Sequence, residues 1–431
     1  MLRPILKNFR KNNLVKIGSV NSVGVLITSL CSIASSKIIA LYLGAEGMAI
    51  LGNLRNFLAS IQTVATLGLY NGFVKYVSEL KRNKTELVAM LSTSYYICFV
   101  VTMSMSFWMY FWPDFWDQWI FGSTFSNPEL FKYIAIALPF YASNIMCLAI
   151  INGFSRYKIF IILNIAGSIV GFTITFFLIW QYALLGALYA LVINPAISLL
   201  LTLTIILYQR NLVVFLKANK ISKKYIKNLS AYGIMALLSA IIFPMVYIYI
   251  RNYIAQVEGV TKAGFWEAMQ RISNQYMLFV TTLISLYLLP KLSNADHTST
   301  FRIEVGKFLK TVLPVFIVGF ALLFILKKYI ISLLFTEDFQ SMQALFIWQL
   351  SGDLLKIIAI TIACQLLAKK MFWEYVISEL LSFISLYVLS TILIDEFGFV
   401  GASMAHLGNF VIYLMVIVFI FRKYFYKSSN Q

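Results

Sequence analysis

The segment Ile159–Trp180, IFIILNIAGSIVGFTITFFLIW, decides the fold class of this chain. It contains no charged residue, and as a helix it is long enough to cross a bilayer core of about 30 Å. A second apolar segment, residues 184–208, follows after a short gap. The two segments predict a pair of consecutive membrane-spanning helices.

The same pattern continues through the chain. Of its 431 residues, 60% are hydrophobic and 12% are charged, and a soluble domain carries about 25% charged residues. We therefore predict an all-α polytopic membrane protein and exclude soluble enzymes, nucleic-acid-binding proteins and disordered scaffolds. Twelve spans are predicted, at residues 17–43, 47–78, 87–111, 130–152, 157–180, 184–208, 229–254, 263–290, 308–327, 342–368, 372–394 and 399–421.

The distribution of Lys and Arg predicts the orientation of these spans. If the N-terminus is cytoplasmic, 25 of the 35 basic residues fall in cytoplasmic segments, four fall in outer segments and six fall within spans. Such a bias places both termini in the cytoplasm, which requires an even number of spans. The net charge of +18 then marks cytoplasmic loops and not a nucleic-acid partner. Arg251, at the outer end of the seventh span, is expected at the membrane interface.

Cysteine and histidine usage indicates neither a disulfide framework nor a metal site. All four cysteines lie in apolar stretches without a CxxC pair, and two histidines are too few for a haem or a multi-histidine metal site. We expect no bound cofactor and no metal. The N-terminal region is polar and basic as far as Lys16, so we also expect no cleaved signal peptide.

A basic central loop divides the chain into two halves of six spans each. We predict an N-terminal six-helix lobe at 1–210, a basic cytoplasmic linker at 211–228 and a C-terminal six-helix lobe at 229–431. An offset of 216 residues places Arg55 on Arg271 and Lys75 on Lys291. Because six is an even number, the two halves are parallel repeats, a build in which transporters bind substrate near the membrane midplane.

Basic residues within the spans are candidates for substrate binding. A charge inside a span costs about 2.5–3.5 kcal/mol and normally faces a cavity or a partner. The alternatives are local: Arg271 has Glu267 four residues earlier, and Lys75 has Glu79 four residues later. The surplus of bases suits an anionic substrate, because Arg and Lys bind phosphates through charge-assisted hydrogen bonds. The candidates are Arg55, Arg271, Lys356, Lys37 and Lys75.

Two carboxylates are candidates for coupling transport to an ion gradient. Asp353 and Lys356 lie three residues apart on one helix face, either as a self-neutralising pair or as a coupling site. Glu379 has no basic residue one turn away, so it either pairs across helices or takes part in coupling. A proton or Na⁺ gradient could drive transport. No Walker motif is evident, which argues against direct use of ATP.

Three motifs resemble those of a known family. They are LYLGAEGMAILGNLR at 41–55, GFVKYV at 72–77 and WQLSGDLLK at 348–356. The chain resembles the Wzx-type flippases for O-antigen and enterobacterial common antigen over essentially its whole length. These flippases belong to the multidrug/oligosaccharidyl-lipid/polysaccharide exporter superfamily.

The resemblance implies a fold and a function. It implies two six-helix lobes that form a MATE-like V around a cationic central cavity, in the bacterial inner membrane. The implied substrate is an undecaprenyl-pyrophosphate-linked oligosaccharide, moved from the cytoplasmic to the periplasmic leaflet by alternating access. Membrane lipids and polysaccharide polymerase or assembly proteins are the further expected partners. Functional charges are implied at the positions that match the motifs: Arg55, Lys75, Asp353 and Lys356.

Two other readings stay open at this point. A drug/cation antiporter of the same superfamily would need an excess of interior carboxylates, whereas bases predominate here, and the superfamily's peptidoglycan-precursor flippases typically have fourteen spans. A membrane glycan polymerase or ligase would need catalytic groups, but the longest outer loop offers Asp114 and Asp117 without a basic or histidine partner. We therefore expect a transporter and not an enzyme.

Overall fold

The computed structural model describes residues 13–208, 222–293 and 298–422, and within these ranges the chain is helical, without a β-strand. The described residues form two compact units. The first contains the residues up to Tyr42 together with Leu54–Ile241, and the second contains Leu43–Asn53 and the chain from Ile242 onward. Most of the predicted linker, at 211–221, lies outside the described residues.

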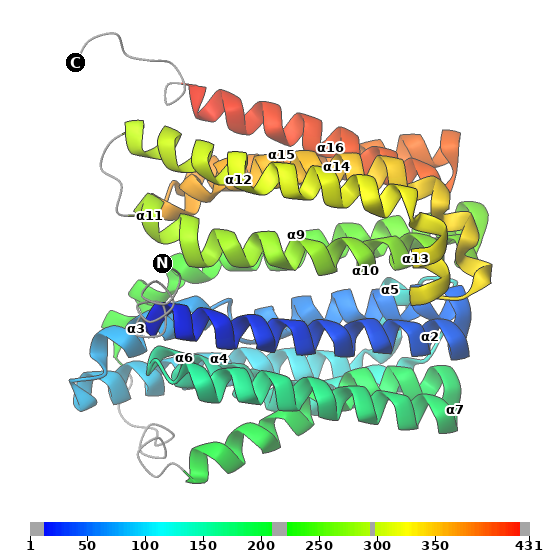
Figure 1. Ribbon diagram of the computed structural model, residues 1–431. Coiled ribbons are helices and arrows are strands. Elements are labelled where there is room, and N and C mark those ends of the chain that lie inside the picture. The colour runs from blue at the N-terminus through cyan, green and yellow to red at the C-terminus, as the bar shows by residue number, and fades with distance from the viewer. Residues whose placement is uncertain (1–12, 209–221, 294–297, 423–431) are drawn as a thin grey trace, which may run out of the picture. The chain divides into compact units, whose positions relative to one another are not determined.

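The first unit is built from helices that run side by side (Figure 1). Its hydrophobic core gathers around Phe73, Met90 and Ile150, which come from three different helices. The helices are α2 (Asn13–Ala65, except its middle part), α3 (Tyr70–Leu80), α4 (Lys84–Phe111), α5 (Pro113–Phe121), α6 (Pro128–Gly153), α7 (Tyr157–Tyr208) and the beginning of α9 (Lys223–Glu258).

The second unit adds the middle of α2 and the rest of α9 to the C-terminal helices. Helix α16 packs against both α14 and α15, and α10 contacts α14. The further elements are α10 (Val260–Leu283), a π-helical turn η2 (Ile284–Leu288), α11 (Leu289–Ser293), α12 (Thr298–Ile325), α13 (Lys327–Leu334), a 3₁₀ segment η3 (Glu337–Leu345), α14 (Phe346–Ala368), α15 (Phe372–Phe397) and α16 (Phe399–Ile420).

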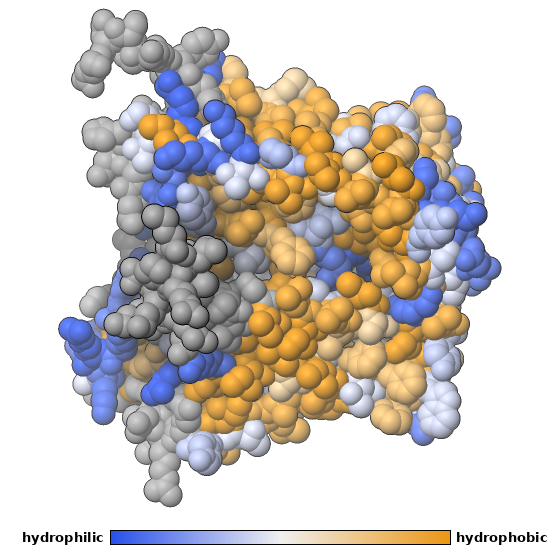
Figure 2. Space-filling view, in the orientation of Figure 1, coloured by the Kyte–Doolittle hydropathy of each residue, from blue (hydrophilic) through white to orange (hydrophobic). Residues whose placement is uncertain are grey.

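The described helices account for the twelve predicted spans. Ten segments are long and apolar enough to cross a membrane, and two of them, Val23–Ala65 and Tyr157–Tyr208, are 43 and 52 residues long. Each long segment contains a non-helical residue, Gly44 or Ala183, and so holds two crossings. On the face in Figure 2, apolar residues cover the middle of the helices and hydrophilic residues gather at their ends. The all-α polytopic fold is confirmed.

One predicted span is interrupted. The predicted helix 47–78 ends at Ala65, and α3 begins only at Tyr70. Between them Leu67 and Gly68 adopt left-handed φ angles of 52° and 63°, which a continuous helix does not allow. Lys75 therefore lies on a different helix from Arg55.

The backbone shows that the internal repeat has an offset of 215 residues. Left-handed φ angles recur at this spacing in three pairs of residues: Gly44 and Gly259, Ser155 and Lys370, and Ala183 and Gly398. A close approach recurs at the same spacing. A Cβ atom on Gly186 would lie 1.8 Å from the carbonyl oxygen of Leu178, and one on Gly401 would lie 1.9 Å from that of Leu393. Both glycines thus close a tight helical hairpin.

This spacing corrects the predicted register of the repeat by one residue. The offset of 216 was based on two charge pairs, whereas the backbone angles fix 215 on both sides of the helices concerned. At an offset of 215, Arg55 corresponds to Gln270 and Arg271 corresponds to Asn56. The two arginines are therefore not equivalent residues of the repeat, and each has to be considered in its own surroundings.

Candidate functional site

Two buried arginines of the second unit share one carboxylate. Arg251 of α9 bonds Glu267 of α10 at 2.5 Å, and the Nε of Arg271, one turn further along α10, bonds the other oxygen of Glu267 at 3.2 Å. Arg251 is 1% exposed, Glu267 5% and Arg271 7%. Two positive charges thus meet one negative charge away from water. The cluster carries a surplus positive charge, which is costly in a membrane span unless an anion or a polar cavity compensates it.

The middle of α2 completes this cluster. The side-chain oxygen of Asn53 accepts a 2.6 Å bond from Arg251, and its amide nitrogen donates a 2.7 Å bond to Asn252. Gly264 permits the close approach of α2 and α10, because a Cβ atom there would lie 1.9 Å from the carbonyl oxygen of Ala45. Arg251 also lies 5.5 Å from the ring of Trp266, at a distance that suits a cation–π contact.

Asp353 forms the centre of a second buried network. Its Oδ2 accepts hydrogen bonds from Ser273 at 2.7 Å, Tyr276 at 2.5 Å and Gln349 at 3.2 Å, and its Oδ1 lies 3.0 Å from Nε2 of His406. Asp353 is 0% exposed. The network therefore joins α10, α14 and α16 through one carboxylate.

Gln349 extends this network in two directions. Its side-chain oxygen accepts bonds from Gln270 of α10 at 3.1 Å and from Ser403 of α16 at 3.3 Å. Gln270 directly precedes Arg271 along α10, so the two networks lie next to each other along one helix. A change in either network can reach the other through α10.

The predicted ion pair between Asp353 and Lys356 does not form within the described part of α14. Both oxygens of Asp353 are bonded to other residues. The amine of Lys356 lies 5.5 Å from the ring centre of Phe410 on α16, and its side chain is half-buried. The self-neutralising alternative is therefore wrong, because α10 and α16 supply closer partners than the same helix does.

Glu379, the second coupling candidate, pairs across helices. It is buried on α15 and accepts a 3.1 Å hydrogen bond from the hydroxyl of Tyr413 on α16. A tyrosine hydroxyl satisfies one lone pair of the carboxylate but does not neutralise its charge. Whether Glu379 takes part in coupling stays a prediction.

Three predicted cations belong to the first unit. Lys37 and Arg55 are half-buried on α2, and Lys75 lies on α3 at 3.8 Å from Glu79. The side chains of Lys75 and Glu79 are 40% and 53% exposed, which agrees with the local ion pair weighed for them. Arg271, Lys356, Asp353 and Glu379 all belong to the second unit, whereas these three lie in the first.

The sequence analysis missed two residues of the site. Arg251 was expected at the interface, but it is fully buried because its partner Glu267 lies on the next helix. His406 was considered only as a metal ligand, yet it is 3% exposed and faces Asp353. A signal was available for both, because each is a charged or titratable residue within a predicted span.

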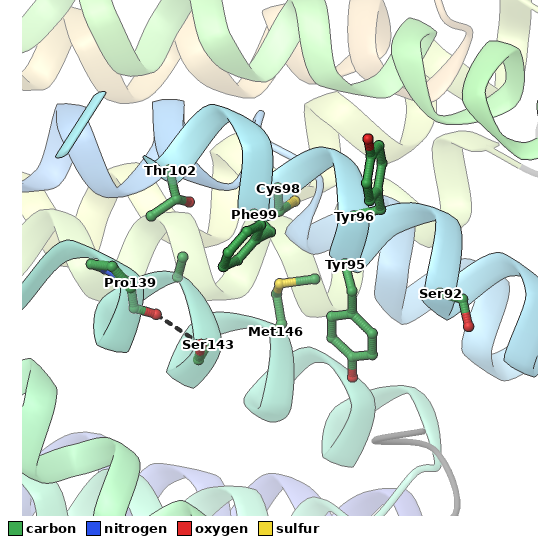
Figure 3. A pocket seen from close by; sticks show the side chains of 10 residues that line it. Ser92, Tyr95, Tyr96, Cys98, Phe99, Thr102, Pro139, Ser143 and Met146 are labelled. Atoms are coloured by element: carbon green, nitrogen blue, oxygen red, sulfur yellow. Dashed lines mark hydrogen bonds between the residues drawn. The ribbon is translucent and has the colours of Figure 1, made fainter. Parts of the chain in front are cut away.

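An apolar groove lies between α4 and α6 in the first unit (Figure 3). It has a volume of about 470 Å³. Ser143 at its edge donates a 2.7 Å bond to the carbonyl of Pro139, and the hydroxyl of Tyr95 is buried without a hydrogen-bond partner in the described chain. The groove suits a hydrocarbon chain and not a charged group. It is lined by Ser92, Tyr95, Tyr96, Cys98, Phe99, Thr102, Pro139, Ala142, Ser143 and Met146.

Solved structures with a similar fold come from one superfamily. An inward-facing MATE multidrug resistance transporter of the MOP superfamily superposes with a TM-score of 0.79 and 12% identity, covering 92% of this chain and 94% of the other. The lipid II flippase MurJ in an inward closed conformation gives a TM-score of 0.72 and 16% identity, covering 95% and 87%. At this level of identity the likeness shows the fold alone, and it agrees with the predicted MATE-like architecture.

Sequence comparison identifies the family. The chain is 28% identical over 420 residues to the lipid III flippase of Escherichia coli strain K12, and the match covers 95% of each protein. That relative is named as a flippase, in agreement with the expectation that the chain is not an enzyme. The sequence pattern of the family described as "Polysaccharide biosynthesis protein" matches residues 56–344. The chain is therefore a multi-pass membrane protein that belongs to this polysaccharide biosynthesis family, and its resemblance to the Wzx-type flippases is confirmed.

Proposed function

We propose that the chain is a flippase for an undecaprenyl-pyrophosphate-linked oligosaccharide, either an O-antigen unit or a related surface-polysaccharide unit. It moves this lipid from the cytoplasmic to the periplasmic leaflet of the bacterial inner membrane, with both of its own termini in the cytoplasm. The observation that carries the proposal is the surplus positive charge of Arg251, Glu267 and Arg271. The name of the lipid III flippase from Escherichia coli supports the same substrate class.

A pyrophosphate headgroup would balance the surplus charge. Guanidinium groups bind phosphate oxygens through paired, charge-assisted hydrogen bonds, which are stronger than neutral ones. Arg251 is the more deeply buried of the two arginines and also holds Asn53, so it positions Glu267. Arg271 is the member that we assign to the substrate.

The other intramembrane bases extend the path of the headgroup. Lys37 and Arg55 on α2, Lys75 on α3 and Lys356 on α14 contact the phosphates and the first sugars at different stages of transport. The hydrocarbon tail stays in the bilayer throughout, because moving it through a polar path would cost its hydrophobic burial. Alternating exposure of the site to the two sides of the membrane then carries the headgroup across. A proton or Na⁺ gradient drives the cycle through Asp353 or Glu379.

Glycolipid export in cells that lack the chromosomal gene tests this function. The wild-type chain should restore surface glycan, whereas Arg271→Ala and Arg55→Ala should leave the precursor on the cytoplasmic side while the protein remains in the membrane. Lys310→Ala on α12 and Lys81→Ala after α3 are matched controls, because both remove an exposed lysine. Both controls should export normally.

Two outcomes would contradict the proposal. Normal export by Arg271→Ala and Arg55→Ala would remove the role of the buried cations. A translocated but unpolymerised or unligated precursor in cells without the chain would instead point to a polymerase or a ligase.

A further inference from the structure

The second unit contains a buried polar network for which the first unit has only apolar counterparts. With the repeat offset of 215 residues, each member of the Asp353 network has an equivalent position in the first unit. Asp353 corresponds to Leu138, and His406 corresponds to Leu191. The remaining members, Ser273, Tyr276 and Gln349, correspond to Leu58, Ile61 and Ile134. Helix α6 packs against α7 in the first unit, as α14 packs against α16 in the second.

This comparison separates the needs of the fold from those of function. The first unit builds the same helices and the same tight hairpins with leucine and isoleucine at these positions. Burying a carboxylate and its polar partners is costly, and replacing buried ionic groups by well-packed apolar residues is often neutral or stabilising. The network is therefore not required to form the helical repeat. Its presence in the second unit calls for a functional explanation.

The geometry around Asp353 favours an ionised carboxylate beside a histidine that takes up a proton. Ser273, Tyr276 and Gln349 all donate to Oδ2, and the Nε2 of His406 faces Oδ1 at 3.0 Å. A carboxylate surrounded by donors is held in its charged form. Nδ1 of His406 bonds no side chain in the described part of the chain, and it is the ring nitrogen at which a proton can be added or removed.

The neighbouring elements supply the other titratable groups around the pair. From α14, Lys356 acts electrostatically on Asp353, and its amine lies near the ring of Phe410, which in turn packs edge-on against His406. From α9, Tyr247 faces the same carboxylate. From α10, the hydroxyl of Tyr276 is bonded to it directly. Glu379 of α15 is bonded to Tyr413 instead.

We propose that His406, held by Asp353, is the site that binds and releases the proton that drives transport. This inference rests on the proposed flippase function and adds the identity of its coupling site. A proton from one side of the membrane adds to Nδ1, and the net charge of the pair changes from −1 to zero. The same proton later leaves toward the other side. The site does not suit Na⁺, because a hard cation needs several oxygen ligands with open lone pairs, and here those of Asp353 face donors.

A double variant that copies the first unit tests the coupling. Asp353→Leu combined with His406→Leu gives the second unit the residues found at the equivalent positions 138 and 191. We expect this variant to fold with unchanged or higher thermal stability. In proteoliposomes with a fluorescent undecaprenyl-pyrophosphate sugar, a pH gradient should accelerate transport by the wild type. The variant should keep the same rate with and without the gradient.

The controls separate a failure of this inference from a failure of the proposed function. Glu374→Gln on α15 removes a carboxylate outside the network and should leave the response to the gradient intact. If the double variant still responds to the gradient, the inference is wrong while the flippase function stands. If the wild type moves the lipid only in response to a Na⁺ gradient, the inference is also wrong.

A second measurement does not depend on transport. The chain has only two histidines, His297 and His406, so a His297→Gln variant labelled with ¹⁵N-histidine gives a single imidazole signal. In lipid nanodiscs this signal should change from the neutral form to the imidazolium between about pH 8 and pH 5. A spectrum that does not change over this range would overturn the inference. A titrating signal from a chain that moves no glycolipid would support the proton site and refute the flippase.

Discussion

Gly52 of α2 lies directly against the carboxylate of Glu267 on α10. A Cβ atom built on Gly52 would lie 2.6 Å from that carboxylate and 2.9 Å from the guanidinium carbon of Arg251. Real Cβ atoms do not approach their neighbours so closely. The absence of a side chain at residue 52 is therefore what allows the charge cluster to form against α2.

Replacing Gly52 by alanine should weaken the second unit. In Gly52→Ala the added methyl group must displace Glu267 or Arg251, and overpacking of this kind costs typically about 1–3 kcal/mol. Thermal unfolding of the purified chain in detergent would measure the loss. Gly306→Ala on α12 is the matched control, because nothing lies within 4 Å of the added Cβ atom. A Gly52→Ala variant as stable as the control would show that the cluster can move aside without cost.

Neutralising Glu267 should cost more stability than neutralising a surface carboxylate. Glu267→Gln leaves the buried Arg251 and Arg271 without a counter-charge, and breaking a buried ion pair costs about 3–5 kcal/mol. The comparison is Glu79→Gln, which breaks the exposed pair with Lys75 and should cost about 0–1 kcal/mol. Thermal unfolding of both variants under one condition gives the difference. Equal stability of the two variants would contradict the buried pairing.

The twelve spans could be predicted from the sequence because each apolar block is long enough to cross the membrane by itself. The interruption after Ala65 could not be predicted, because no proline marks it. Its only local signal is Gly68, one of 21 glycines in the chain. The repeat was found from two charge pairs, but its register was off by one residue. Those charges belong to different local networks, whereas the left-handed backbone angles are fixed by the fold itself.

The candidate site could be predicted only in part, because side-chain pairing depends on contacts between helices. The sequence placed Asp353 and Lys356 on one helix face, but it does not show that Ser273 and His406, 80 and 53 residues away, approach Asp353 more closely. Arg251 was misplaced for the same reason. Periodicity identifies the face of a helix that is buried, but not the helix that covers it.

Removing the charge of Glu379 tests whether this carboxylate takes part in transport. Glu379→Gln keeps an oxygen that can accept the hydrogen bond of Tyr413, so stability should change by less than about 1 kcal/mol. If the carboxylate takes part in coupling, glycolipid export should fall to the level of cells without the chain. Glu374→Gln, on the first turn of the same helix, should export normally. Wild-type export by Glu379→Gln would make the carboxylate a structural partner of Tyr413 only.

The orientation of the chain can be tested at two exposed residues. Lys81, in the turn after α3, is predicted to be cytoplasmic, and Asp114, on the first turn of α5, is predicted to lie outside. Starting from a chain in which all four cysteines are replaced by alanine, Lys81→Cys and Asp114→Cys each introduce one reactive thiol. A membrane-impermeant maleimide should label Asp114→Cys in cells whose outer membrane alone is permeabilised. It should label Lys81→Cys only after the inner membrane is opened. The reverse pattern would invert the orientation and, with an even number of spans, place both termini outside, contrary to the excess of Lys and Arg.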